Sequence, residues 1–209
     1  MMCFVRRSLS RLFLTWPRLL THATSLLVLA WMLTDFALHL EDYTANRALM
    51  LRSGFVGLVW LAASFACTPI NRWLHWPQAV RIRRALGLYG FLFVAIHLAV
   101  YLWLDNDFTL ELILRDLDER RAMAIGLIAF ALLMPLALTS TKGWQRRLGR
   151  GWSRLHKLAY LALPLSVWHY VWLDRDFITV PLVFAVLVGI LLLARLTKGT
   201  SRKTSQVGP

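Results

Sequence analysis

Three histidines lie within or at the edge of long apolar segments of this chain: His97, His156 and His169. A polar imidazole ring is costly to bury in an apolar environment unless it has a partner. Neutral imidazole is also a common axial ligand of haem iron. Two such rings meeting across a bundle of helices would form a bis-histidine cofactor site, which is typical of an electron carrier.

The elements that must position these rings are membrane-spanning helices. Of the 209 residues, 58% are hydrophobic, and the mean hydropathy is +0.55, whereas soluble domains of this length carry more charge and shorter apolar runs. Several runs approach the roughly 20 apolar residues that cross a bilayer core. The sequence therefore predicts an all-α integral membrane protein, a six-helix bundle with spans near 19–38, 51–68, 86–104, 122–138, 155–173 and 179–196.

We expect one membrane domain at residues 19–196, with a basic cytoplasmic tail at 1–18 and a polar cytoplasmic tail at 197–209. The first apolar run is about 20 residues long, which exceeds the h-region of a typical secretory signal, so it is interpreted as a retained helix. The chain has no glycine-rich nucleotide-binding motif on a strand–helix unit. Another molecule would therefore have to deliver any electrons that it carries.

The charges are divided between the two sides of the predicted membrane. The net charge is +13, and 18 of the 24 Lys and Arg residues share one side: they fall in the two tails, in the segments 69–85 and 139–157, and at Arg195 near the end of the last predicted span. All 11 acidic residues fall toward the other side. The positive-inside rule then predicts that both termini are cytoplasmic. This distribution argues against nucleic-acid binding, which a basic patch on a soluble face would indicate.

Depth within the membrane predicts which rings can meet. His97 lies 13 residues after Arg84, the last inner-side charge before its helix, and His169 lies 15 residues after Arg154. At about 1.5 Å per residue these spacings correspond to depths of ~20 and ~22 Å. We therefore predict that His97 and His169 lie at one level in the outer half of the membrane and are the axial ligands of one haem iron.

His156 precedes His169 by 13 residues and lies ~20 Å deeper toward the cytoplasm, so it cannot share that iron. A second haem, a flavin and a quinone at the inner edge are all open roles for this ring. A second bis-histidine site would need another imidazole at this level. The residue 14 positions before His97 is Arg83, which is not a ligand, and His22 is the other histidine in the spans at that depth. A hydrogen-bonded packing role is the alternative for each ring.

The basic segment 139–156 connects two predicted spans on the cytoplasmic side. It suits a connection that lies on the lipid headgroups, and it also suits a docking or phosphate-binding surface for a flavin or a reductase. The acidic outer loops offer a surface for a partner on the other side. The two cysteines, Cys3 and Cys67, indicate neither a disulfide framework nor a thiolate metal site.

Two stretches of the chain resemble the MsrQ family, the haem-binding membrane subunits of bacterial MsrPQ systems, which have a ferric-reductase-like transmembrane domain. The first stretch is Arg81-Ile-Arg-Arg-Ala-Leu-Gly-Leu-Tyr-Gly-Phe with His97-Leu-Ala-Val-Tyr101. The second contains Ala137-Leu-Thr-Ser-Thr, Gln-Arg-Arg-Leu-Gly and Trp-Ser-Arg-Leu-His156-Lys-Leu-Ala-Tyr160, followed by His169-Tyr170. The likeness covers most of residues 40–196.

The resemblance implies a b-type cytochrome of the bacterial inner membrane, an electron-transfer subunit rather than a stand-alone enzyme. It would take electrons from a cytoplasmic flavin reductase or from quinol. It would pass them to the periplasmic molybdopterin enzyme MsrP, which repairs methionine sulfoxide in proteins. By motif, His97, His156 and His169 are the ligand candidates for haem b, and the family is also described as binding FMN. Larger relatives carry two histidines on each of two helices, whereas this chain has one on its third span and two on its fifth.

Two alternatives stand beside this interpretation. One is a quinol-linked cytochrome with a different electron acceptor. The other is a haem-free transporter or scaffold in which the histidines line a proton or substrate path. A spectrum of the purified protein separates the second alternative from both cytochromes.

Overall fold

The computed structural model describes residues 2–42, 44–173 and 178–196, and every regular element within them is helical. The prediction of an all-α fold is therefore confirmed. The predicted tail at 197–209 lies outside the described residues, and the predicted tail at 1–18 falls within the first helix. The elements are α1 (Met2–Leu38), α2 (Ala45–Leu74), α3 (Pro77–Val100), the π-helix η1 (Tyr101–Asp105), α4 (Leu110–Glu119), α5 (Arg121–Leu138), α6 (Lys142–Leu148), α7 (Arg150–Leu155), the 3-10 turn η2 (His156–Leu158), α8 (Ala159–Leu173) and α9 (Thr179–Leu196).

Four helices among the described residues are long and apolar enough to cross a membrane. They are Trp16–Leu38 within α1, all of α2, α3 continued through η1 to Asp105, and α5. The fifth and sixth predicted spans correspond to shorter apolar segments, the 15-residue helix α8 and Thr179–Arg195 of α9. The turn η2 separates α8 from α7 and so shortens the fifth. These apolar helices identify a membrane protein, while six crossings and cytoplasmic termini stay predictions.

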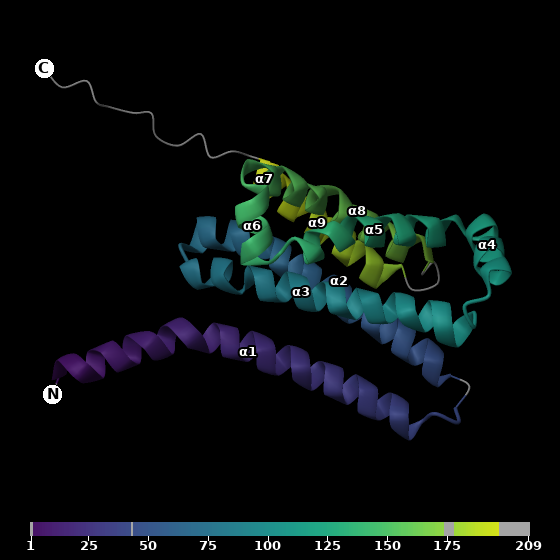
Figure 1. Cartoon of the computed structure of the whole chain (residues 1–209), viewed down its shortest axis with the longest axis horizontal. Helices are drawn as coiled ribbons and strands as arrows, with labels where there is room; N and C mark the ends of the chain where they lie inside the picture. Colours follow the sequence, from purple (N-terminus) through teal and green to yellow (C-terminus); the bar gives the residue numbers. More distant parts are fainter. Residues whose placement is uncertain (1, 43, 174–177, 197–209) are drawn as a thin grey trace, which may run out of the picture.

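The helices α2 and α3 form an antiparallel pair with a tight connection (Figure 1). His75 ends α2 in a left-handed conformation with φ of 51°, Trp76 is extended, and Pro77 begins α3. Proline suits the first helical position and keeps the preceding residue out of the helical region. A Cβ at Gly57 or Gly90 would lie 2.7 or 2.9 Å from a side chain of the other helix. The two glycines therefore permit the close approach that sets the position of α3 against α2.

The helices α5 and α8 form a second closely packed pair, and α9 packs on α8. One core cluster joins α2, α8 and α9 through Leu58, Phe65, Leu163, Val167, Val188 and Leu191. Another joins α1 to α2 and α3 through Met32, Leu49, Phe93 and Val100. The two helix pairs thus belong to one bundle, and α1 runs along the outside of the α2–α3 pair (Figure 1).

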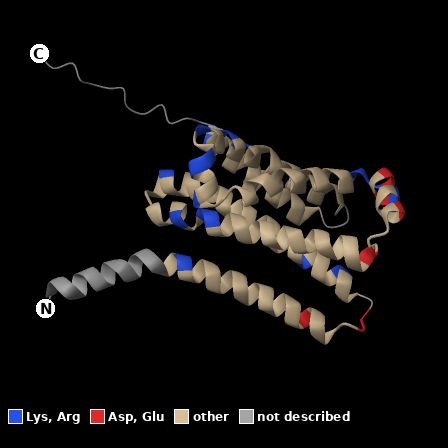
Figure 2. Cartoon of the chain, in the orientation of Figure 1, with Lys and Arg blue, Asp and Glu red and all other residues tan. Residues whose placement is uncertain are grey.

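The two ends of this bundle differ in charge (Figure 2). Acidic side chains gather at the end that carries α4 and the connection from α1 to α2, where ion pairs such as Arg52–Asp35 and Arg115–Glu119 form. Most of the Lys and Arg positions coloured blue in Figure 2 lie at the opposite end. Following the positive-inside rule, we call the acidic end the outer end and the basic end the inner end.

Candidate functional site

The side chain of His97, on α3, lies against α2. Its Nδ1 is 2.8 Å from the carbonyl oxygen of Met50. A carbonyl oxygen only accepts hydrogen bonds, so Nδ1 carries a proton, and in the neutral ring Nε2 keeps the lone pair that can bind a metal. A Cβ on Gly54, one turn after Met50, would lie 2.8 Å from the same Nδ1. The glycine therefore provides the space in which the ring rests on α2.

His169, on α8, has the same relation to α5. Its Nδ1 is 2.6 Å from the carbonyl oxygen of Ala122. A Cβ on Gly126, one turn after Ala122, would lie 2.7 Å from this Nδ1. The proton on Nδ1 again leaves Nε2 as the nitrogen that can bind a metal in the neutral ring.

The two histidine sites repeat at a fixed interval along the chain. Each Nδ1 bonds to the carbonyl oxygen of the residue 47 positions earlier. Met50, Gly54 and His97 are each followed, 72 positions later, by Ala122, Gly126 and His169. The α2–α3 pair and the α5–α8 pair therefore present their imidazoles in equivalent ways.

The imidazoles of His97 and His169 lie beside each other between the two helix pairs. Their ring centres are 6.3 Å apart, and their planes are inclined by 77°. Two imidazoles that bind one metal from opposite sides, at about 2.0–2.1 Å from each nitrogen, hold their ring centres roughly 6 Å apart. The ring separation thus fits a single metal between the two side chains.

The donor set also indicates what kind of metal centre fits. Within the described residues, no group of three or more His, Cys, Asp and Glu side chains could hold a metal ion. Two opposed imidazoles suit a metal whose other bonds come from a macrocycle, as in haem. Hydrogen bonds from ligating histidines to backbone carbonyls are the usual means of fixing the ring orientation and the tautomer. His97 and His169 therefore fit a haem iron, with Met50 and Ala122 as supports.

His156 lies apart from this pair, in the turn η2 before α8. Its Nδ1 is 3.1 Å from the carbonyl oxygen of Trp152, and its ring stacks on that indole at 3.9 Å between centres. The indole Nε1 in turn donates to the carbonyl oxygen of Thr139 at 3.0 Å. His156 is thus held by the segment 139–156, for which the sequence leaves open a position on the lipid headgroups or a docking surface for a flavin or a reductase.

A cavity of about 340 Å³ lies beside His156, and we call it the inner pocket. It is bounded by α2, α3, α5, α8 and α9 and by the segment 139–156, and Arg84 also lines it. Arg84 precedes His156 by 72 positions, the same interval that relates the outer histidines. The lining contains one histidine, so the described residues place an arginine where a second imidazole would be expected.

An aromatic pair lies between the level of the outer histidines and the inner pocket. Phe91 on α3 stacks on Phe130 of α5 at 5.5 Å between ring centres, with planes 16° apart. Phe91 also lines the inner pocket. Six residues, about 9 Å of helix, separate Phe91 from His97. The inner pocket and the histidine pair therefore share the interior of one bundle.

Two further histidines, His22 and His39, lie outside both sites. His22 bonds to the hydroxyl of Tyr89 at 2.9 Å, toward the outside of the α2–α3 pair. His39 bonds to the backbone oxygen of Asp35 at 2.7 Å near the outer end.

Several residues of these sites were missed from the sequence. Gly54 and Gly126 were not predicted, although each stands 43 positions before its histidine, which is the signal that could have found them. The pocket also contains Arg195 of α9, which had been interpreted only as a sign of membrane orientation.

Comparisons with known proteins agree with this architecture. A family described as "Ferric reductase like transmembrane component" matches residues 53–167. A relative from Rhodospirillum rubrum is 39% identical over 171 residues, which cover 80% of this chain and 82% of the relative. One from Caulobacter vibrioides is 41% identical over 152 residues, covering 71% and 72% of the two chains. Both are named protein-methionine-sulfoxide reductase heme-binding subunit MsrQ.

A third protein of that name, from Herminiimonas arsenicoxydans, is 39% identical over 142 residues, 66% of this chain and 65% of the relative. No solved structure matches the chain. The resemblance seen in the two sequence stretches around the histidines is therefore confirmed at the level of the family.

Proposed function

The chain belongs to the MsrQ family, and we propose that it is a b-type cytochrome subunit that carries electrons across the bacterial inner membrane. It takes them from a cytoplasmic flavin reductase or from the quinone pool. It passes them to a periplasmic molybdopterin enzyme of the MsrP type, which repairs methionine sulfoxide in proteins. In this proposal the protein is the electron-transfer subunit of an oxidoreductase system and not a catalyst by itself.

The observation that carries the proposal is the adjacent pair His97 and His169, with ring centres 6.3 Å apart. A haem held there supplies one-electron transfer, because two imidazoles leave the iron no open position for oxygen. The chain's own residues hold the rings: the carbonyl oxygens of Met50 and Ala122 accept from Nδ1 and fix each ring plane. Apolar helices surround the partly buried pair, and an apolar shell limits the access of water to a metal site.

The position of the histidine pair suits transfer to a periplasmic partner. His97 is four residues before the π-helix η1, which leads to the outer end of the bundle. The acidic helix α4 lies at that same end (Figure 2). A partner with a basic surface around its redox centre would meet a complementary field there.

His156 belongs to the electron-entry side in this proposal. The sequence alone leaves both a second haem and a flavin open as groups that could contact His156. The arginine at position 84 favours the flavin, because it replaces the second axial imidazole with a cation that can pair with phosphate. We therefore propose FMN, or a flavin delivered by a reductase, as the group that meets this chain beside His156.

A reduced-minus-oxidised spectrum of the purified protein tests the haem directly. Bands of a b-type cytochrome support the proposal, and their absence would leave the haem-free transporter or scaffold. The second step uses liposomes with a flavin reductase and NADH inside and an MsrP-type enzyme outside. Reoxidation of the haem by that enzyme with methionine sulfoxide supports the proposed acceptor. A haem that is reduced but not reoxidised would indicate a quinol-linked cytochrome with another acceptor.

A further inference from the structure

The carbonyl oxygen of Met50 has more hydrogen-bond donors around it than a carbonyl can fully satisfy. It accepts from Nδ1 of His97 at 2.8 Å and also from Oγ of Ser53 at 3.0 Å. In a regular α-helix the backbone N–H of the residue four positions later donates to the same oxygen, and here that residue is Gly54. A carbonyl oxygen has two lone pairs. Three donors therefore share two lone pairs at Met50.

The equivalent carbonyl beside His169 has no third donor among the described residues. The residue 72 positions after Ser53 is Ile125, whose side chain has no hydrogen-bonding atom. The carbonyl oxygen of Ala122 thus accepts from the imidazole and from the backbone of its own helix. The distances follow this difference, because the imidazole bond to Ala122 is 2.6 Å and the one to Met50 is 2.8 Å. The two ring supports are therefore equivalent in position and unequal in strength.

The bond from Ser53 to its own helix is common in kind and unusual in its acceptor. Serine side chains often bond back to a carbonyl one turn earlier. Ser25 does so toward Thr21 of α1, and neither of these two residues accepts a bond from a histidine in the described part of the chain. Ser53 is completely buried, and a buried hydroxyl is costly to leave without a partner. Its hydroxyl therefore competes persistently with the imidazole for Met50.

Hydrogen bonding at Nδ1 affects how strongly Nε2 donates to a metal. A strong bond to a carbonyl raises the basicity of the imidazole, and a more basic ligand stabilises ferric over ferrous haem. Hydrogen bonds to the ligands are thus one means by which a protein sets a haem potential. We propose that Ser53 is a positioning residue that weakens the support of His97 and so raises the reduction potential of the haem. The inference rests on the proposed function, because it concerns the haem held by His97 and His169.

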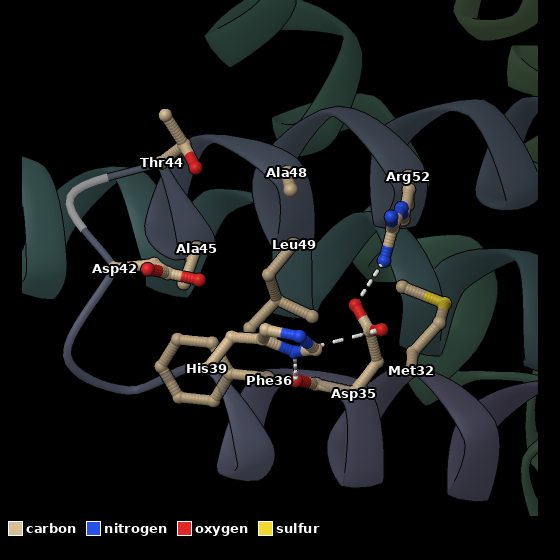
Figure 3. Close-up of a pocket in the computed structure, with 10 residues that line it drawn as sticks. All are labelled: Met32, Asp35, Phe36, His39, Asp42, Thr44, Ala45, Ala48, Leu49 and Arg52. Carbon is tan, nitrogen blue, oxygen red and sulfur yellow. Dashed lines mark hydrogen bonds and ion pairs between the residues drawn. The ribbon is translucent and has the colours of Figure 1, made fainter.

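The charged neighbour of Ser53 on α2 is engaged elsewhere. Figure 3 shows Arg52 directed at Asp35 of α1, beside a cavity of about 180 Å³ that both residues line. The two side chains form an ion pair, and His39 approaches the same carboxylate at 3.8 Å. The charge of Arg52 is therefore balanced between α1 and α2. Replacing Ser53 leaves this pair in place, so a changed potential would report on the hydroxyl.

The first arm of the test removes the hydroxyl. Ser53→Ala leaves the carbonyl oxygen of Met50 to the ring and the helix, so His97 should donate more strongly. We expect the ferric–ferrous equilibrium to shift toward ferric haem by about threefold, which lowers the potential of a one-electron couple by about 30 mV. Potentiometric titration of the full chain in nanodiscs measures the shift, and the ferric EPR spectrum reports whether both imidazoles stay bound. Ser25→Ala is the matched control, because that serine is equally buried and bonds to its own helix in α1.

The second arm adds a hydroxyl at the equivalent position of α5. Threonine can bond back to a carbonyl of its own helix, so Ile125→Thr should give Ala122 a third donor. The potential should then rise by a similar amount. Ile125→Val is the control, because it has nearly the shape of threonine and adds no donor.

A lowered potential in Ser53→Ala and a raised potential in Ile125→Thr, each relative to its control, support the proposal. Failure of either shift overturns it. Loss of haem from Ser53→Ala also overturns it, because the serine would then be a structural support of the ring. A chain that binds no haem overturns the proposed function and this inference with it, whereas bound haem with an unchanged potential in Ser53→Ala overturns this inference alone.

Discussion

At the outer end of the bundle, the α2–α3 pair and the α5–α8 pair each hold one imidazole between a carbonyl oxygen and a glycine of the partner helix. At the inner end, the α2–α3 pair presents Arg84 where the other half of the bundle presents His156. The comparison teaches that a histidine alone does not make the outer site. A backbone acceptor and a glycine recur with each outer ring, whereas the inner end combines one imidazole with arginines.

The largest effect is expected from removing one of the equivalent rings. His97→Ala or His169→Ala leaves a single imidazole for the iron, so either variant should lose most of the haem. The measurement is haem per protein, from the pyridine haemochrome and the reduced-minus-oxidised spectrum. His22→Ala is the control, because that ring bonds to Tyr89 outside both sites. Full haem absorbance in either alanine variant would refute the ligand pair.

Gly54→Ala and Gly126→Ala test whether the two halves support their rings in the same way. The added Cβ would lie 2.8 Å from Nδ1 of His97 or 2.7 Å from Nδ1 of His169, so the ring must move off its carbonyl acceptor. Overpacking of this kind costs roughly 1–3 kcal/mol. We expect haem binding to weaken by about fivefold to a hundredfold, and the measurement is haem retention during titration with apomyoglobin.

Gly189→Ala is the matched control for this pair, because a Cβ at that position of α9 would meet no described atom within 4 Å apart from the nearby backbone of its own helix. The contact at Gly126 is tighter, so its substitution should have the larger effect. If only one of the two glycine variants lost haem, the equivalence of the two helix pairs would be wrong, even if both histidines were ligands.

The meeting of His97 and His169 was predictable because inner-side arginines mark the membrane edge and helical rise converts sequence spacing into depth. Gly54 and Gly126 were harder to predict, because glycine is common in apolar helices and has no chemistry of its own. Their role emerges only when α2 packs against α3 and α5 against α8.

Arg195 was missed for a related reason, because its place in the pocket depends on how α9 packs beside α2, and hydropathy carries no information on that contact. The end of a helix is also weakly specified by apolar content. The span predicted at 51–68 lies within a helix that runs from Ala45 to Leu74, because polar residues continue the helix beyond the apolar run.

The smallest effect on haem is expected at the inner end, and it tests the difference between the two ends. His156→Ala leaves both outer rings and their carbonyl acceptors in place, so at least part of the haem should remain bound. It removes the imidazole that stacks on Trp152 beside the inner pocket, so reduction from the cytoplasmic side should slow. Stopped-flow reduction by a flavin reductase with NADH measures this rate, and dithionite reduction of the same sample is the control for the haem itself. Complete loss of haem from His156→Ala would mean that the inner histidine is a ligand on which the whole site depends, and the contrast between the two ends would then disappear.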